Sequence, residues 1–332
     1  MRDDKTDIPR ELLIWGYAVL ADRFKGGLAR PFNVGSLITG GELMYFKTTR
    51  AAVTVAGGVV ALCLGSVPAA LAAPAQNTPS VPCSPQALNA AISTADQGET
   101  LELAPGCTYR LAGALPSIKT NLTIVGHHST LTRTHNAPGF SLLTVRGADL
   151  TVINVNFTDG GGYMVGKGGA IDNARGTLNV TGGTFSGNET DNVGGAIYND
   201  GHMTVKNATF THNLAPYGGA IENDHNASIT RSTFTRNKPA LHGDPRNSDG
   251  GAIYNNGYLY LTHSKFVGNS TGGNGGAIYT QHHLDARHLT VSANTAGLYG
   301  GGIYDDAGRP ATLFASVVSR NQPNNCNNVP GC

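Results

Sequence analysis

A repeating pattern of small, apolar and polar positions runs through the C-terminal half of the chain. Each copy reads Gly-Gly-Ala-Ile (Gly-Gly-Gly-Ile in the last copy), then one variable residue, then a polar residue that is Asn in four of six copies. A near-constant step of this length indicates a solenoid, in which each repeat forms one turn. The steps are 26, 24, 32, 25 and 25 residues, counted between Gly168, Gly194, Gly218, Gly250, Gly275 and Gly300.

A second pattern, Phe-x-x-Asn, keeps the same step, and short stretches of alternating polar and apolar residues lie between the two patterns, as half-buried strands do. Successive turns lie about 4.8 Å apart, so equal positions stack on one another. We therefore expect a buried Ile column, a Phe column and an amide ladder. The columns comprise Ile171, Ile197, Ile221, Ile253, Ile278 and Ile303, and Phe185, Phe210, Phe234 and Phe266; the ladder comprises Asn173, Asn199, Asn223 and Asn255.

These patterns predict an all-β fold, a right-handed parallel β-helix of about nine turns over residues 83–332. A leucine-rich repeat would need a different Leu and Asn signature, and a propeller would need a longer period. Residues 84–92 are typical of a short helix, because Ser84 suits the N-cap and Pro85 the first turn. We expect this helix to cover the open first turn of the solenoid.

The segment before the solenoid has the pattern of an export signal. Residues 44–72 combine a basic start at Lys47 and Arg50, an apolar run and an Ala-Leu-Ala cleavage site. A transmembrane anchor is the alternative, but glycines and a proline make the run weak for spanning a bilayer. We interpret residues 1–43 as an extension from a start assigned too early, with a genuine amphipathic extension as the alternative, and residues 73–82 as a flexible linker.

Composition and charge exclude some functions. Charged residues make up 14% of the chain, which does not fit a disordered polyelectrolyte or a nucleic-acid binder. Residues 1–72 hold 8 of the 23 Lys and Arg and 6 of the 22 Asp and Glu, so the rest of the chain has a net charge of −1. This balance argues against electrostatic capture of nucleic acid or an anionic membrane.

Four cysteines remain once residues 1–72 are removed: Cys83, Cys107, Cys326 and Cys332. In an exported chain they point to two disulfides, with three pairings possible. We favour Cys83–Cys107 and Cys326–Cys332, because each pair brackets one end of the repeat array, where stacking cannot protect the fold.

The Gly-Gly-Ala-Ile and Phe-x-x-Asn motifs resemble the repeats of the chlamydial polymorphic outer membrane protein family. The whole chain after the signal resembles secreted actinobacterial right-handed β-helix proteins with a pectin-lyase-like fold, and residues 104–109 fit that group. The first resemblance implies surface exposure and adhesion. No segment typical of a membrane barrel follows Val329, so we expect free secretion or loose association with the wall of a bacterial cell.

Acidic residues follow the expected amide ladder. Asp200 and Asp224 would lie about 5 Å apart on neighbouring turns. That spacing suits Ca²⁺ or a pair of catalytic carboxylates, whereas two solvated turn residues are the simpler explanation. No sugar-hydrolase or pectate-lyase motif accompanies them.

The variable position of the Gly-Gly motif is the second candidate. It should point outward if Ile points inward. An exposed strip of Tyr198, Tyr254, Tyr279 and Tyr304 could stack on sugar rings or bind a protein, and the alternative is a structural aromatic stack.

Two further segments stand out. Residues 238–247 form an insertion in the long step, which is either functional or merely tolerated. His282, His283, Asp285 and His288 cluster in one turn, but alternation separates His282 from His283, so we do not expect a metal site.

The sequence thus supports two hypotheses. The first is a secreted or cell-surface, adhesin-like interaction module without catalysis, which acts as a monomer on a polysaccharide or surface protein. The second is a polysaccharide lyase or glycoside hydrolase, which rests on analogy of fold. We expect no cofactor beyond a candidate Ca²⁺, no nucleic acid, and no membrane span after signal cleavage.

Overall fold

The computed structural model describes residues 80–240, 245–306 and 311–332. The predicted extension (1–43), the signal peptide (44–72) and most of the linker (73–82) lie outside these residues, as does the middle of the insertion. Within the described part, no helix is long and apolar enough to cross a membrane.

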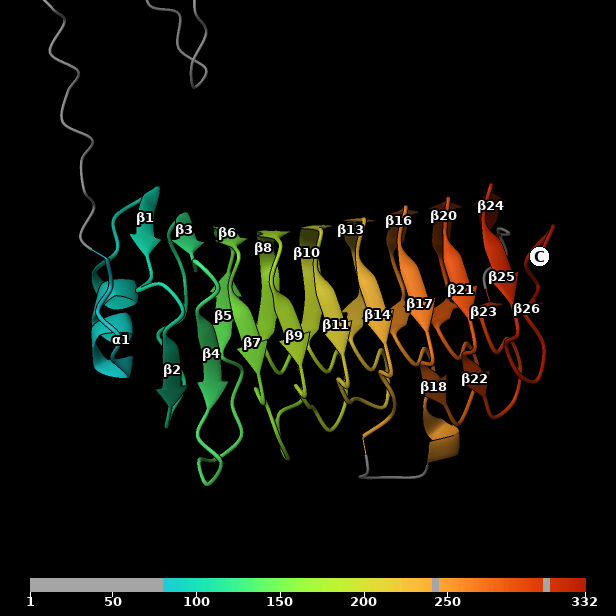
Figure 1. Cartoon of the computed structure of the whole chain (residues 1–332), viewed down its shortest axis with the longest axis horizontal. Coiled ribbons are helices and arrows are strands. Elements are labelled where there is room, and N and C mark those ends of the chain that lie inside the picture. Colours follow the sequence, from blue (N-terminus) through green and yellow to red (C-terminus); the bar gives the residue numbers. More distant parts are fainter. Residues whose placement is uncertain (1–79, 241–244, 307–310) are drawn as a thin grey trace, which may run out of the picture. The chain divides into compact units, whose positions relative to one another are not determined.

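The described chain is a parallel β-solenoid, in which strands of successive turns lie side by side along one axis (Figure 1). Each regular turn contributes strands to three walls, which we name the motif wall, the middle wall and the phenylalanine wall. All pairings between named strands are parallel, for example β10 with β12, β13 with β16 and β11 with β14. The prediction of an all-β solenoid is confirmed.

The motif wall carries the Gly-Gly motifs and belongs to the same sheet as the middle wall, because β8 and β10 run through both. The strands of this sheet beyond β8 (Ile171–Thr181) and β10 (Ile197–Lys206) belong to one wall each. In the motif wall they are β5 (Leu143–Arg146), β12 (Ile221–Asn223), β15 (Ile253–Asn255), β19 (Ile278–Thr280), β23 (Ile303–Asp305) and β26 (Cys326–Asn327). In the middle wall they are β1 (Glu99–Glu102), β3 (Leu122–Val125), β6 (Asp149–Ile153), β13 (Asn226–Thr230), β16 (Tyr258–Thr262), β20 (His283–Arg287) and β24 (Thr312–Phe314).

The phenylalanine wall is a separate sheet of nine strands, one for each turn of the solenoid. Its strands are β2 (Thr108–Leu111), β4 (Thr130–Arg133), β7 (Asn156–Thr158), β9 (Thr184–Ser186), β11 (Thr209–Thr211), β14 (Thr233–Thr235), β17 (Lys265–Val267), β21 (Thr290–Ser292) and β25 (Val317–Ser319). Two short strands, β18 (Ser270–Thr271) and β22 (Thr295–Ala296), pair beside it, and a 3-10 helix, η1 (Pro245–Asn247), ends the insertion.

The predicted side-chain columns fill the core. The Ile residues of the six motifs are register partners from turn to turn and are fully buried. The Phe rings stack with centroids 4.6–4.9 Å apart, and the column begins one turn earlier than predicted, at Phe157. Each ring excludes water from its neighbours, so the turns stabilise one another.

The predicted amide ladder is also present. Each Asn Nδ2 donates to the next Oδ1 at 2.7–2.8 Å from Asn173 to Asn255, which then donates to Thr280 Oγ1 at 2.9 Å. The Asn residues of Phe-x-x-Asn, continued by Asn294 and Asn321, form a second ladder that was not predicted, in which each Nδ2 donates to the next Oδ1 at 2.9 Å. Both ladders satisfy polar groups that the turns bury.

The two glycines of each motif have different roles. Gly194 has a φ of 58°, in the left-handed region that favours glycine. A Cβ on Gly195 would collide with the carbonyl oxygen of Gly219 on the next turn. The pair therefore allows a tight corner and close stacking of consecutive turns.

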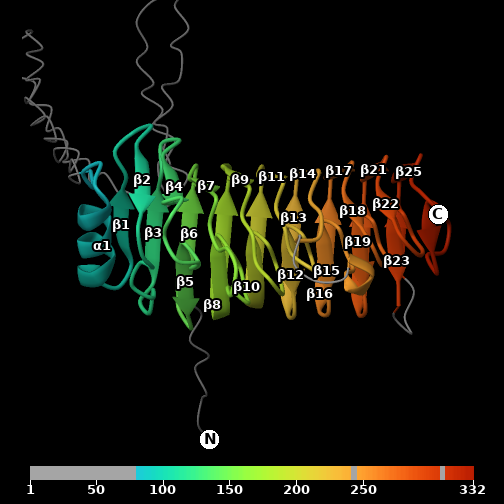
Figure 2. The ribbon, with the colours of Figure 1, turned by 90° about the horizontal axis from the view of Figure 1, so that it is seen from below.

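The first turn is covered as predicted. Helix α1 (Pro85–Thr94) lies across the N-terminal end of the solenoid (Figure 2) and buries Leu88 and Ile92. The Ser84 hydroxyl accepts a hydrogen bond from the Ala87 N–H at 3.3 Å, which caps the helix. The disulfides are Cys83–Cys107 and Cys326–Cys332, the favoured pairing, with Cα atoms 5.6 and 6.0 Å apart.

Candidate functional site

The variable positions of the Gly-Gly motifs form a continuous row along the motif wall, which we name the motif stripe. Three of its tyrosine rings stack, with centroids 4.8 Å apart for Tyr254 and Tyr279 and 5.4 Å apart for Tyr279 and Tyr304. The stripe comprises Asp172, Tyr198, Glu222, Tyr254, Tyr279 and Tyr304, which are register partners on successive turns.

The motif stripe is not the exposed strip that the sequence predicts. Tyr198 and Tyr279 are each only 5% exposed, and Tyr254 and Tyr304 are half-buried. The prediction of exposure is wrong because the segments before the motifs cover the row. The Lys167 ammonium lies 4.0 Å from the centre of the Tyr198 ring, and Tyr217 packs edge-on against Tyr254.

Two of the four tyrosine hydroxyls of the stripe donate hydrogen bonds to aspartates. Tyr198 donates to Asp224 Oδ2 at 2.7 Å, and Tyr279 donates to Asp306 Oδ2 at 2.8 Å. Burial, and then the hydrogen bond to Asp224, raises the pKa of Tyr198. These phenols therefore stay neutral and act as structural donors.

One carboxyl group of the stripe, that of Glu222, interacts with Asp224, two residues further along the chain. Burial of Glu222, followed by the negative charge of Asp224 and a hydrogen bond to it, raises the pKa of Glu222 to about 9. Glu222 is therefore a neutral acid at pH 7 and a hydrogen-bond donor toward Asp224. Asp224 Oδ1 also accepts from Asn256 Nδ2 at 3.0 Å, whereas Glu222 Oε2 is buried without a hydrogen-bond partner.

Asp172, one turn before Tyr198 in the stripe, and Asp200 form a second group of acids. Burial raises the pKa of Asp172, although the Arg146 guanidinium, 2.9 Å from Asp172 Oδ2, opposes this effect. The predicted carboxylate pair occupies equal positions on neighbouring turns, but Asp224 is hydrogen-bonded to Glu222, and the half-buried Asp200 acts on the pKa of Asp172 through its charge. Among the described residues, no three His, Cys, Asp or Glu side chains are placed to hold a metal ion.

A different row of aromatic side chains is open to solvent. Tyr258 and Tyr260 are 46% and 44% exposed on the outer surface of β16, and Phe314 of β24 is 61% exposed. Tyr258 packs against His282 and His283, with ring centroids 4.7 and 5.7 Å apart, and Tyr260 lies 5.5 Å from His283. We name these five residues the aromatic face.

The aromatic face is confined to the C-terminal turns of the middle wall. In earlier turns the row of Tyr260 carries only small polar side chains, since Tyr260 pairs with Ser228 and Ser228 pairs with Thr204. Alternation along residues 258–262 indicates that these tyrosines point outward, because Leu259 and Leu261 of the same strand are buried. These two tyrosines were not among the predicted site residues.

The histidine cluster serves the same surface. His282 and His283 both contact Tyr258, whereas His288 stacks on His263 with centroids 4.7 Å apart. Asp285 pairs with Arg287.

The described ends of the insertion, 238–240 and 245–247, lie before β15, where Ser248 and Thr271 share a hydrogen bond of 3.0 Å.

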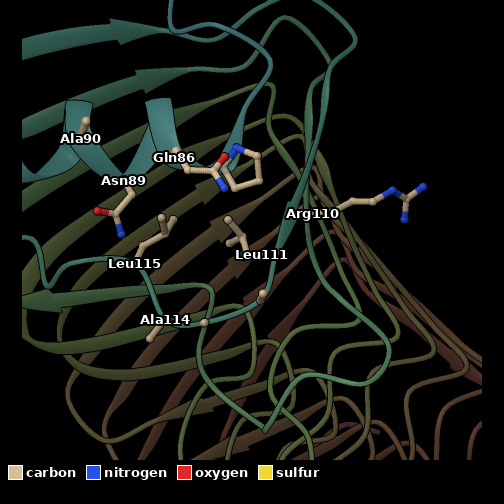
Figure 3. Close-up of a pocket in the computed structure, with 10 residues that line it drawn as sticks. Gln86, Asn89, Ala90, Arg110, Leu111, Ala114 and Leu115 are labelled. Carbon is tan, nitrogen blue, oxygen red and sulfur yellow. The ribbon is translucent and has the colours of Figure 1, made fainter.

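An open pocket of about 360 Å³ lies at the N-terminal end, between α1 and the end of β2. Gln86, Asn89, Leu111 and Leu115 line it, and the side chain of Arg110 points away from it (Figure 3). Because its lining is apolar with two carboxamides, the pocket offers no acid, base or nucleophile for chemistry.

Comparison with known proteins agrees with the repeat assignment. The family model of the Chlamydia polymorphic membrane protein (Chlamydia_PMP) repeat matches residues 182–200 and 264–281. Each segment contains one Phe-x-x-Asn motif and the Gly-Gly-Ala-Ile motif that follows it. The chain is thus a parallel β-solenoid that carries repeats similar to those of polymorphic membrane proteins. No curated protein matches the chain, and no solved structure matches it.

Proposed function

We propose that this protein is an exported, non-catalytic interaction module that binds carbohydrate outside a bacterial cell through the aromatic face. The observation that carries the proposal is the exposure of Tyr258 and Tyr260 beside His283 on a regular sheet. Sugar rings present C–H groups on their faces, which pack against flat aromatic rings, and exposed aromatic side chains are typical of binding surfaces.

Several features support a location outside the cell. Two disulfides close the ends of the solenoid, and disulfides persist in oxidising compartments. The predicted signal at 44–72 and the match to a membrane-protein repeat agree with export. The resemblance to secreted actinobacterial proteins with a pectin-lyase-like fold points the same way.

The solenoid suits binding without large conformational change. The aromatic face lies on β16, β20 and β24, whose neighbours are fixed by parallel pairing on consecutive turns. Buried columns and ladders hold these turns in register. A surface that is already rigid loses little entropy when it binds a ligand.

The catalytic alternative, a polysaccharide lyase or glycoside hydrolase, has less support. Glycosidase carboxyl groups stand about 5 to 9.5 Å apart, with room for the sugar or water between them. Glu222 and Asp224 instead bond directly to each other, and Glu222 is only 5% exposed. This pair therefore suits a structural role.

The test is a binding and turnover screen of the purified full-length chain on polyuronates and neutral glycans, with and without Ca²⁺. We expect binding without product formation, and loss of binding in Tyr258→Ala/Tyr260→Ala. The matched control is Thr204→Ala/Ser228→Ala, which alters the same wall in earlier turns and should keep binding. Robust turnover, or equal binding by the tyrosine variant, would overturn the proposal.

A further inference from the structure

Charges are distributed unevenly between the motif wall and the middle wall, although residues 73–332 are nearly neutral as a whole. The carboxyl groups of the motif stripe and its flanks lie on the motif wall, where Asp224 and Asp306 accept bonds from tyrosine hydroxyls. From β10 onward, the middle wall and its corners carry the opposite character. Their basic and imidazole side chains, from β10 to the turn after β20, are His202, Lys206, His225, Arg231, His263, His282, His283, Arg287 and His288.

Within the middle wall, the outward positions of residues 202–206 of β10 and of β13, β16, β20 and β24 contain one acidic residue, Asp285. Arg287 binds it with two parallel hydrogen bonds, from Nε to Oδ1 at 3.0 Å and from Nη2 to Oδ2 at 2.9 Å. This contact neutralises Asp285 and holds the guanidinium on the surface, where its side chain is 56% exposed. No acidic group on these rows is left to repel an anion.

The cations and the aromatic rings belong to one surface. Arg287 is the register partner of Thr262 on β16 and of Phe314 on β24, and Lys206 lies in the same row on β10. Along this row, Lys206 and Arg287 are three turns apart, which is about 14 Å. A ligand that lies along the axis of the solenoid would therefore meet rings and cations together.

We propose that the aromatic face binds a polyanionic polysaccharide, whose sugar rings stack on Tyr258 and Tyr260 and whose anionic groups lie against Arg287, Lys206 and the surrounding imidazoles. This inference rests on the proposed function and adds the charge of the ligand to it. Net charge alone would miss this site, because its bases are offset by acids elsewhere in the chain.

A single-stranded nucleic acid offers related chemistry, with base rings and phosphates. The disulfides and the predicted export signal favour a glycan, because an exported protein meets wall and extracellular polysaccharides first. Nucleic acid is therefore an outcome of the test that would overturn the inference.

The experiment measures binding of the full-length chain to three polymers with one backbone, namely dextran, carboxymethyl dextran and dextran sulfate, and to single-stranded DNA. Salt is set at about 0.05 M and about 0.5 M, because screening weakens contacts between exposed charges. We expect at least one charged dextran to bind roughly 10-fold more tightly than dextran at low salt, and this preference to shrink at high salt.

Two variants locate the charge contact. Lys206→Gln and Arg287→Gln should together lower affinity for the charged dextrans roughly 10-fold, with little change for dextran. Lys265→Gln is the matched control, since Lys265 is an exposed lysine on the phenylalanine wall. Thermal unfolding of each variant checks that the solenoid is intact.

The results separate the two proposals. Equal binding of neutral and charged dextrans would overturn the inference and leave carbohydrate binding in place. A failure to bind any dextran would overturn both, and so would a preference for single-stranded DNA. A charge preference that Lys206→Gln/Arg287→Gln does not reduce would overturn this location for the ligand.

Discussion

The tyrosines of the motif stripe and those of the aromatic face differ in their exposure to solvent. In the motif stripe, Tyr198 and Tyr279 are 5% exposed and donate to aspartates, whereas Tyr258 and Tyr260 of the aromatic face are nearly half exposed. Both rows point away from the core, so alternation along the strand treats them alike. The difference comes from the segments beside them, because residues such as Lys167 and Tyr217 cover only the stripe. A side chain that points away from the core is therefore not always exposed to solvent.

The largest effect expected from this comparison is on stability. Tyr279→Ala removes a ring stacked between Tyr254 and Tyr304, so we expect a loss of about 3–5 kcal/mol in the free energy of unfolding. Tyr258→Ala removes an exposed ring and should change it by less than about 1 kcal/mol. Denaturant titration measures both, and equal losses in the two variants would erase the distinction between the rows.

The next effect concerns binding and should have the reverse order. Tyr258→Ala/Tyr260→Ala is expected to weaken glycan affinity by about 2 kcal/mol, or roughly 30-fold, as for central aromatic contacts in other interfaces. Tyr304→Phe, which changes only a hydroxyl in the stripe, should leave affinity unchanged. Calorimetric titration with the best glycan from the screen provides the measurement, and a loss confined to Tyr304→Phe would contradict the assignment.

Acidity offers a third way to separate the rows. The pKa of Glu222 rises from its usual 4.5 to about 9 in the folded state, so its contribution to stability is complete below about pH 4.5 and is lost as pH rises through about 9. Glu222→Gln keeps a neutral donor to Asp224. It should therefore be more stable than the wild type by about 1–3 kcal/mol near pH 8 and similar near pH 4.

Thermal unfolding across this pH range provides that measurement. Parallel curves for the wild type and Glu222→Gln would show that Glu222 is not held as a neutral acid. Asp285→Asn on the middle wall is the control. Because the pKa of Asp285 is lowered by its bond to Arg287, its contribution is present above the usual 3.8 and disappears only at lower pH.

The smallest effect comes from one hydroxyl. Tyr198→Phe keeps the ring under Lys167 but leaves Asp224 without one donor, and we expect a cost of about 1 kcal/mol. Tyr260→Phe on the aromatic face should have almost no effect on stability. Melting temperatures of the two variants, measured in one buffer, test this difference, which a larger loss for Tyr260→Phe would reverse.

Much of the core could be predicted from the sequence, because stacking converts equal spacing into contact. The Ile and Phe columns, the Asn173–Asn199 ladder bond and the N-terminal helix all follow from repeated positions or from a cap at Ser84. The second ladder had the same signal, since Asn188 and Asn213 are 25 residues apart and bond at 2.9 Å.

The surface was harder to predict. The segments that cover the motif stripe vary in sequence from turn to turn, with Lys167, Val193 and Tyr217 at equivalent positions. No repeated residue type therefore predicts them. The partner of Asp224 was missed for a related reason. Asp224 interacts with Glu222, two residues before it in the chain, and not with Asp200, its equivalent in the neighbouring repeat. The spacing between turns does not reveal this contact.

Tyrosine footprinting with hydroxyl radicals and mass spectrometry tests the central claim most directly, since it measures exposure and ligand contact in one experiment. The structure predicts fast labelling of Tyr258 and Tyr260, slow labelling of Tyr198 and Tyr279, and protection of the first two when the best-binding dextran is added. Fast labelling of Tyr198 and Tyr279, or protection in the motif stripe alone, would contradict it.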